Sequence, residues 1–197
     1  MQEPTNATPA PTTEGPVSSS LRHELRGWTR DLLLAVGLAM VIIIFLYQPV
    51  KVEGTSMAPL LTDQERIFIN KFVYRFEPIE RGDVVVFWYP LDRSKSFIKR
   101  VVGLPGETVE IRQGRVYVNG KRLNEPYVPA QFTDVSTFGP VRVPPDEYFV
   151  MGDHRASSND SRVFGPVPTH YIYGKAVFAY WPMERFGSIP PSAEHVK

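Results

Sequence analysis

The stretch DVVVFWY, residues 83–89, is the segment of this 197-residue chain that decides its fold. Three consecutive valines and three aromatic residues favour a β-strand, because branched and aromatic side chains pack well on a pleated surface. Turn-forming residues, Gly82 and Pro90, bound the run. The segment therefore predicts a strand, and the question is how far this pattern extends along the chain.

The same pattern recurs on both sides of this segment. Further β-branched or aromatic runs lie at 66–70, 97–102, 108–112, 115–118, 148–151 and 175–181. Asn119-Gly120 predicts a hairpin turn, because type I′ turns need positive φ at both central positions, and Gln113-Gly114 predicts another. Since no comparable helical periodicity follows residue 48, we expect a mainly β domain over residues 49–197.

The first part of the chain differs in composition. Residues 1–27 begin with a stretch rich in Pro, Thr and Ser, and we expect a disordered tail there, because such a segment cannot bury enough apolar surface. No charged or strongly polar residue occurs from Leu32 to Tyr47. With an aromatic residue near each end, residues 28–48 are predicted to form one transmembrane signal anchor.

The charges that flank this apolar run predict its orientation. Arg22, Arg26 and Arg30 precede it, so the positive-inside rule places the N-terminus in the cytoplasm and the β domain on the opposite side of the membrane. A buried core helix is the first alternative, which the uniformly apolar circumference disfavours. A cleaved signal peptide is the second, and residues 48–52 offer no small-x-small cleavage site for it.

Composition excludes several classes of site. The formal net charge is +1, from 22 basic and 21 acidic residues, so nothing indicates a nucleic-acid partner. The chain contains no cysteine, which removes disulfides, thiolate zinc sites and cysteine nucleophiles. We expect no cofactor and no metal.

Two polar residues stand out in apolar segments. Ser56 lies in VEGTSMAP, residues 52–59, and Lys99 lies in FIKRVVGLPGE, residues 97–107. A serine hydroxyl needs a base, and a lysine can serve if burial lowers its pKa from about 10.4 toward neutrality. In a strand, Lys99 shares a face with apolar neighbours while Arg100 points to the other face. An exposed lysine that extends past valines is the alternative for this segment alone.

A histidine base fits the sequence less well. His23 precedes the predicted anchor, His195 is close to the C-terminus, and His170 has no acidic residue beside it. His154 directly follows Asp153, and adjacent residues do not easily form an acid–His–Ser arrangement.

The third segment is GDHRASSNDSR, residues 152–162, a loop of turn formers that follows a strand. A hydroxyl from it could donate to the neutral amine of Lys99, while Asp160, Arg155 and Arg162 could fix the loop by bidentate pairing. A plain surface turn is one alternative. A calcium loop is another, but the segment has too few carboxylates for Ca²⁺.

Together these segments resemble a known family. Residues 54–59, 81–87, 97–107 and 152–162 occur in the order found in the type I signal peptidases of bacteria and the related thylakoidal processing enzymes. The resemblance covers most of residues 50–165. It implies a membrane-bound serine endopeptidase that removes N-terminal signal peptides from secreted preproteins after small residues at −3 and −1, through an acyl-enzyme.

The resemblance also implies roles for single residues. Ser56 matches the nucleophile, Lys99 the general base, and Ser158 the serine that hydrogen-bonds the lysine amine. The backbone N–H of Ser56 would form the oxyanion hole. At Gly54 part of the family has a serine whose hydroxyl helps, so here a backbone group or another donor must substitute.

Two further sets carry over by resemblance. Asp160 and Arg162 with Arg100 look like the structural ion pairs around the site. The shallow pockets for the small substrate side chains would be formed by Val50, Val52, Leu61, Phe97 and Ile98, with the Val52 strand pairing with the extended substrate. Leu60 and His154 depart from the usual threonine and asparagine, and neither is a catalytic position.

The fold that the resemblance implies is a largely antiparallel β catalytic domain with a small β region inserted at about 104–148, after one transmembrane helix. The partners would be secretory preproteins and a lipid bilayer, plasma or thylakoid. A repressor-type Ser/Lys peptidase is disfavoured because it needs a helical DNA-binding domain. A membrane-anchored binding module would leave the Ser56, Lys99 and Ser158 segments without a purpose.

Overall fold

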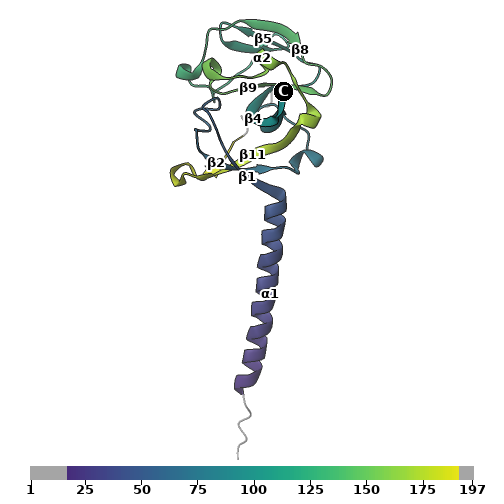
Figure 1. Cartoon of the computed structure of the whole chain (residues 1–197), viewed down its shortest axis with the longest axis vertical. Helices are drawn as coiled ribbons and strands as arrows, with labels where there is room; N and C mark the ends of the chain where they lie inside the picture. The colour runs from purple at the N-terminus through teal and green to yellow at the C-terminus, as the bar shows by residue number, and fades with distance from the viewer. Residues whose placement is uncertain (1–16, 191–197) are drawn as a thin grey trace, which may run out of the picture. The chain divides into compact units, whose positions relative to one another are not determined.

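The computed structural model describes residues 17–190, except for the side chains of residues 17–25, 44 and 45. The chain divides into two compact units, residues 1–43 and 44–197. The first unit contains most of one long helix, and the second contains all the described strands (Figure 1). Residues 1–16 of the predicted tail lie outside the described residues.

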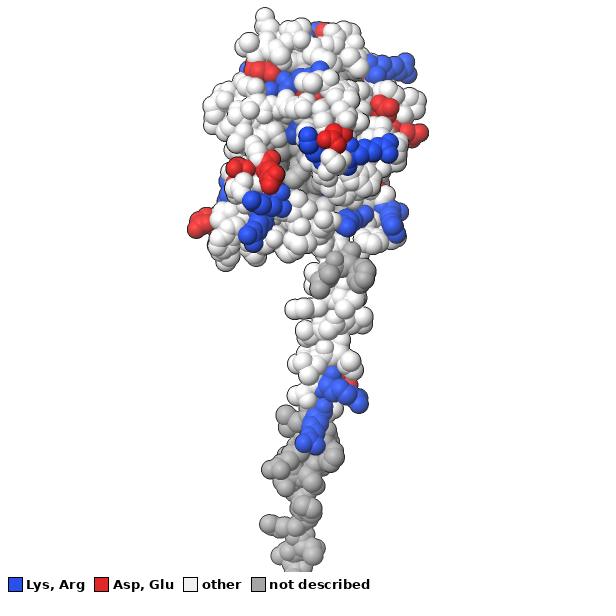
Figure 2. Space-filling view, in the orientation of Figure 1, with Lys and Arg blue, Asp and Glu red and all other residues white. Residues whose placement is uncertain are grey.

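The helix α1 (Val17–Leu46) contains most of the predicted anchor and begins inside the segment predicted as a tail. Its large apolar side chains between residues 26 and 43 are exposed, with Leu33 at 72%. Figure 2 shows uncharged side chains on the visible face of the helix above a small charged cluster. Within the described residues, no helix combines the length and the apolarity that a membrane crossing requires. The anchor at 28–48 stays a prediction.

The end of α1 differs from the predicted boundary at residue 48. Tyr47 and Gln48 begin β1 (Tyr47–Lys51), which pairs in antiparallel register with β2 (Arg66–Asn70). β1 is an edge strand, so Pro49, which lacks an N–H, is tolerated there. Pairing with a strand distant in sequence thus ends the helix at Leu46.

Within residues 17–190, the main sheet contains eight antiparallel strands. Their order is β1-β2-β11-β3-β4-β9-β10, and β12 also pairs with β11. The strands beyond β2 are β3 (Val84–Tyr89), β4 (Asp92–Gly103), β9 (Glu147–Met151), β10 (Val167–Pro168), β11 (Ile172–Trp181) and β12 (Gly187–Ser188). Residues 84–89 of the DVVVFWY stretch therefore form β3, inside the sheet.

A second, smaller sheet lies within the predicted insertion. Its order is β7-β6-β5-β8, and Figure 1 shows β5 beside β8. The strands are β5 (Thr108–Arg112), β6 (Arg115–Val118), β7 (Lys121–Arg122) and β8 (Phe138–Arg142). Both predicted hairpin turns have positive φ at their two central residues: 47° and 73° at Gln113-Gly114, and 51° and 78° at Asn119-Gly120. The predicted mainly antiparallel β domain is confirmed.

Short helical segments join the strands. The helix α2 (Ser161–Phe164) begins after Asp160, whose side chain accepts from the Arg162 N–H and caps it. The 3₁₀ turns are η1 (Val73–Arg75), η2 (Ala130–Phe132), η3 (Arg155–Ser157), η4 (Thr169–Tyr171) and η5 (Met183–Arg185).

The register of β3, β4 and β9 positions the polar residues of the site. Val85 pairs with Lys99, and Val84 and Met151 pair with Arg100 from opposite sides. Of the cationic residues of β4, Lys99 and Arg100 are therefore inside the sheet and buried. A buried cation is costly unless it has hydrogen-bond and charge partners or is deprotonated. Lys99 and Arg100 differ in which of these two conditions they meet.

Candidate active site

Ser56 lies in the loop between β1 and β2. The base of the loop is closed by two backbone hydrogen bonds: Val52 N–H donates to Glu65 O at 2.7 Å, and Gln64 N–H donates to Val52 O at 2.9 Å. The Ser56 carbonyl accepts from His154 N–H at 3.1 Å. The serine is thus held between its own loop and the 152–162 loop.

Lys99 reaches the Ser56 hydroxyl from β4. Its Nζ donates to Ser56 Oγ at 2.7 Å and to Ile98 O at 3.0 Å. Lys99 is only 4% exposed. Its Nζ also lies 5.3 Å from the centre of the Phe97 ring. The two residues singled out from the sequence are therefore adjacent, with the lysine buried and the serine partly exposed.

Burial changes the acidity of this lysine. Desolvation of the ammonium lowers the pKa of Lys99 to about 8, against the opposing effect of the Asp160 and Asp153 carboxylates. In about a tenth of the molecules, Lys99 is then neutral at pH 7. A neutral amine has a lone pair, which can accept the Ser56 proton.

Gly152 is a site residue that sequence reasoning missed. A Cβ built there would lie 2.3 Å from Ser158 Oγ and 2.4 Å from Ser56 O. Only glycine allows both serines to pack against this Cα. The Gly152 N–H donates to Asp160 Oδ2 at 3.1 Å. The sequence places Gly152 at the start of a loop, but it does not reveal a close approach of two distant segments.

We expect Gly152→Ala to reduce the peptidase activity that the resemblance implies by roughly 100-fold, because a methyl group would displace Ser56 or Ser158, and displacements near 1 Å cost about that much. Gly187→Ala is the matched control, since a Cβ there meets nothing within 4 Å. The measurement is kcat on a peptide substrate, with a thermal melt of each variant. Activity of Gly152→Ala within twofold of wild type would contradict this packing argument.

Ser158 lies in the same loop with a buried hydroxyl. Its Oγ makes no hydrogen bond of ordinary geometry within the described chain. It is close enough to Asp160 to help lower the pKa of that carboxyl group. A buried hydroxyl without a well-formed bond is costly, so this oxygen has capacity for a partner.

The ion pairs of the 152–162 loop are more extensive than predicted. Arg162 makes a bidentate pair with Asp160, with Nε–Oδ1 at 2.8 Å, and also pairs with Asp134 at 2.6 Å. Burial alone would raise the pKa of Asp160, but the hydrogen bond and charge of Arg162 hold that pKa below its usual range. The predicted pairing of Asp160 and Arg162 is present.

Arg100 and Arg155 have partners that the sequence did not indicate. Arg100 pairs with Asp153, with Nε–Oδ1 at 2.9 Å and a second contact at 2.7 Å, and both side chains are buried. Arg155 pairs with Glu125 and donates from Nε to Gly152 O at 2.9 Å. Glu125 lies in the insertion, outside every motif, so no sequence signal pointed to it.

A cleft of about 790 Å³ opens beside the serine and the lysine. Four of the predicted pocket residues line it: Val50, Val52, Phe97 and Ile98. Leu61 does not, because it is 0% exposed and packs in the hydrophobic core. The cleft also contains Ser157, an exposed serine of the facing loop.

Ser56 and Gly54, the two positions considered for the oxyanion hole, differ in whether their backbone N–H is already hydrogen-bonded. Within the described residues, the backbone N–H of Ser56 donates to no acceptor. The N–H of Gly54 donates to Asp63 Oδ1 at 2.8 Å, and this bond holds the pKa of Asp63 below its usual range. The Gly54 N–H is therefore occupied inside its own loop.

Among the described residues, no histidine side chain forms a hydrogen bond with Ser56 or Lys99. His154 Nδ1 lies 3.3 Å from Thr55 O, and its ring meets Phe132 edge-on. No group of three or more His, Cys, Asp or Glu side chains in the described residues is arranged to hold a metal ion. The chemistry available at Ser56 is that of a hydroxyl beside a desolvated amine.

Known proteins resemble this chain over most of its length. The family model described as "Signal peptidase, peptidase S26" matches residues 25–181. Signal peptidase I of Bacillus amyloliquefaciens is 42% identical over 165 residues, covering 79% of this chain and 84% of that protein. Probable signal peptidase I-2 of Synechocystis sp. is 41% identical over 171 residues, covering 84% of this chain and 77% of that protein.

A solved structure also matches. The crystal structure of a signal peptidase I from Enterococcus faecalis is 34% identical and covers 50% of this chain and 97% of that chain, with a TM-score of 0.45. The family match extends over most of the chain, and the two relatives align over most of their own length. This chain therefore belongs to the signal peptidase family, peptidase S26.

Proposed function

We propose that this chain is a Ser/Lys endopeptidase that cleaves N-terminal signal peptides from preproteins after small residues at −3 and −1, through an acyl-enzyme. The observation that carries the proposal is the 2.7 Å separation of Lys99 Nζ and Ser56 Oγ around a lysine only 4% exposed. The names of the relatives, signal peptidase I, support the class of substrate.

In the first step, the neutral amine of Lys99 takes the proton of Ser56 as Oγ attacks the scissile carbonyl carbon. The negative charge that develops on the carbonyl oxygen would meet the free backbone N–H of Ser56. The tetrahedral intermediate then collapses. The peptide C–N bond breaks, the Lys99 ammonium returns its proton to the leaving amine, and the signal peptide stays on Ser56 as an ester.

In the second step, water replaces the leaving amine. Lys99, neutral again, takes a proton from the water as the oxygen attacks the ester carbonyl. Collapse of this intermediate breaks the bond to Ser56 Oγ, which regains the proton from Lys99, and releases the signal peptide as a carboxylate. Ser158 would orient the lysine lone pair by donating from its hydroxyl to Nζ.

An extended substrate can pair with the edge at β1. Val52 directs its backbone N–H and C=O toward residues 64 and 65, so these groups are already bonded. Backbone groups alternate in direction along a strand, so substrate pairing would use those of Lys51 and Glu53. This changes the predicted role of Val52, whose contribution would be its side chain in the cleft.

The proposed membrane attachment rests on the sequence. Residues 28–48 would anchor the chain once through a plasma or thylakoid membrane, with the arginines before the apolar run on the cytoplasmic side. The catalytic unit would then meet preproteins as they emerge on the other side.

The test of the substrate class is a preprotein with an Ala-x-Ala site and a matched one with Trp at −1. We expect the chain to cut the first immediately after the Ala-x-Ala sequence and the second at least about tenfold more slowly, because a shallow pocket rejects a bulky side chain. Mass spectrometry of the released chain identifies the bond. Equal rates for the two, or cleavage elsewhere, would contradict the proposed specificity.

A further inference from the structure

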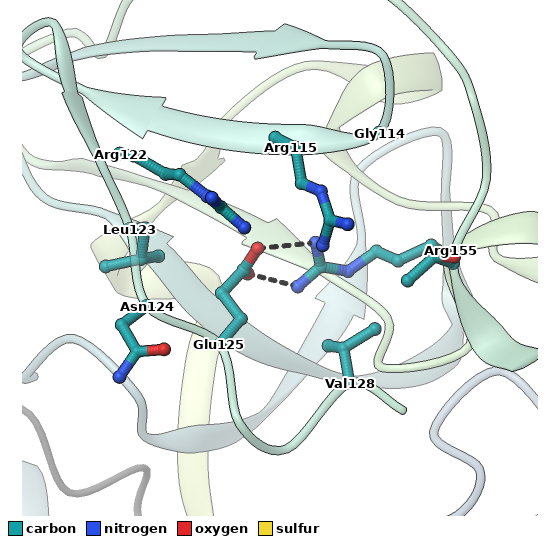
Figure 3. Close-up of a pocket in the computed structure, with 9 residues that line it drawn as sticks. Gly114, Arg115, Arg122, Leu123, Asn124, Glu125, Val128 and Arg155 are labelled. Carbon is teal, nitrogen blue, oxygen red and sulfur yellow. Dashed lines mark hydrogen bonds and ion pairs between the residues drawn. The ribbon is translucent and has the colours of Figure 1, made fainter. Parts of the chain in front are cut away.

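A second pocket lies on the small sheet, and neither Ser56 nor Lys99 lines it. Its volume is about 380 Å³, and its polar walls are Arg115, Arg122, Asn124, Glu125, Thr133 and Arg155. Figure 3 shows the side chains of Arg115, Arg122 and Arg155 directed toward the carboxylate of Glu125. None of the segments that resemble signal peptidases explains this convergence of three guanidinium groups.

The charges of this arginine pocket do not balance. Arg155 is paired with Glu125. The guanidinium groups of Arg115 and Arg122 have no hydrogen bond or ion pair within the described residues. The lining therefore carries three positive charges and one negative charge, an excess of two. Because like charges repel, surface arginines normally lie apart from other cations. The guanidinium groups of Arg115 and Arg122 face one cavity without a partner, so both can donate hydrogen bonds to an anion.

The walls of the pocket are fixed by backbone contacts. A Cβ at Gly114 would lie 1.9 Å from Asp134 O, so glycine there permits the 130–136 segment to pack against the β5–β6 turn. Gly114 N–H donates to Ser136 O at 2.8 Å, and Leu123 N–H donates to Val116 O at 2.9 Å. A preformed site loses less entropy on binding than one that must be ordered.

We propose that the arginine pocket binds a compact phosphate anion, such as a phosphate monoester or pyrophosphate. The excess of two positive charges matches the charge of about −1.5 to −2 that a phosphate monoester carries near pH 7. Guanidinium forks also match the geometry of phosphate oxygens. A single carboxylate would neutralise only half of the excess. The phosphate can come from a soluble metabolite or from the headgroup of a lipid such as phosphatidic acid.

The experiment uses the full-length protein in micelles of a neutral detergent at constant ionic strength. Inorganic pyrophosphate is titrated calorimetrically in one arm, and short-chain phosphatidic acid is added to the micelles in the other. The variant is Arg115→Gln/Arg122→Gln, which leaves Arg155 and its hydrogen bond to Gly152 O intact. The control is Arg142→Gln, an exposed arginine of β8 that does not line the pocket.

We expect saturable binding to wild type and at least about tenfold weaker binding to the double variant, because each lost charge-assisted bond is worth about that factor or more. Arg142→Gln should bind within about twofold of wild type. Saturation by pyrophosphate identifies a soluble source, and saturation by phosphatidic acid alone identifies a lipid source. Failure of both probes to saturate wild type, or equal weakening in Arg142→Gln, would overturn the proposal. Peptidase activity of the double variant checks its folding.

Discussion

Ser56→Ala is expected to lower kcat for preprotein cleavage by at least about 10⁴-fold, because loss of the proposed nucleophile would remove the covalent step that the catalytic groups serve together. Alanine removes one oxygen, and the Ser56 backbone keeps its bond from His154 N–H. The variant should therefore fold, bind substrate and fail to cut. The measurement is single-turnover cleavage with excess enzyme, followed over hours.

Ser157→Ala is the matched control for this loss. Ser157 lines the same cleft, but its side chain is exposed and has no hydrogen bond to Lys99. Its activity should stay within about threefold of wild type, as is usual for an exposed residue outside the reacting set. Comparable losses in the two variants would show that the cleft tolerates no change, and would remove the case for Ser56 as nucleophile.

Lys99→Arg is expected to cost up to about 10⁴-fold in kcat/KM, the upper range for loss of a general base. A guanidinium stays protonated at every accessible pH, so it has no lone pair for the Ser56 proton. The larger group also crowds a position where the side chain is only 4% exposed. Lys99→Met, of similar length and without charge, separates the two effects, since it should be inactive while the protein remains at least as thermostable.

The control for Lys99 is Lys95→Met. Lys95 lines the same cleft and pairs with Asp92 at 3.2 Å, but both side chains are largely exposed. An exposed ion pair contributes little to stability, so this variant should be nearly unchanged in activity and melting temperature. More than a tenth of wild-type activity in Lys99→Met would rule out this lysine as the base.

The parts of the fold predicted from sequence are those fixed by local chemistry. The β-branched run at 83–89 and the positive-φ turn at Asn119-Gly120 depend on neighbours along the chain, and both are present. β1 was not predicted, because its first residues continue an apolar run and only pairing with β2 makes them a strand. The short strands β7, β10 and β12 carry no pattern long enough to detect.

The same contrast between local sequence features and tertiary contacts holds for the candidate site. Ser56 and Lys99 could be singled out from the sequence because each is a polar residue in an apolar segment. The structure places their side chains in contact, with Lys99 Nζ 2.7 Å from Ser56 Oγ. The partners of Arg100 and Arg155 were missed because Asp153 and Glu125 reach them from other segments. The core position of Leu61 and the close packing at Gly152 likewise depend on tertiary contacts.

The dependence of kcat/KM on pH tests the central claim, that a desolvated Lys99 is the base for Ser56, most directly. Burial lowers the pKa of Lys99 to about 8, and only the neutral amine accepts a proton. Activity should therefore rise about tenfold per pH unit below pH 8 and level off above it. A profile that is flat from pH 6 to 9, or a single limb near the histidine pKa of about 6.5, would contradict the account.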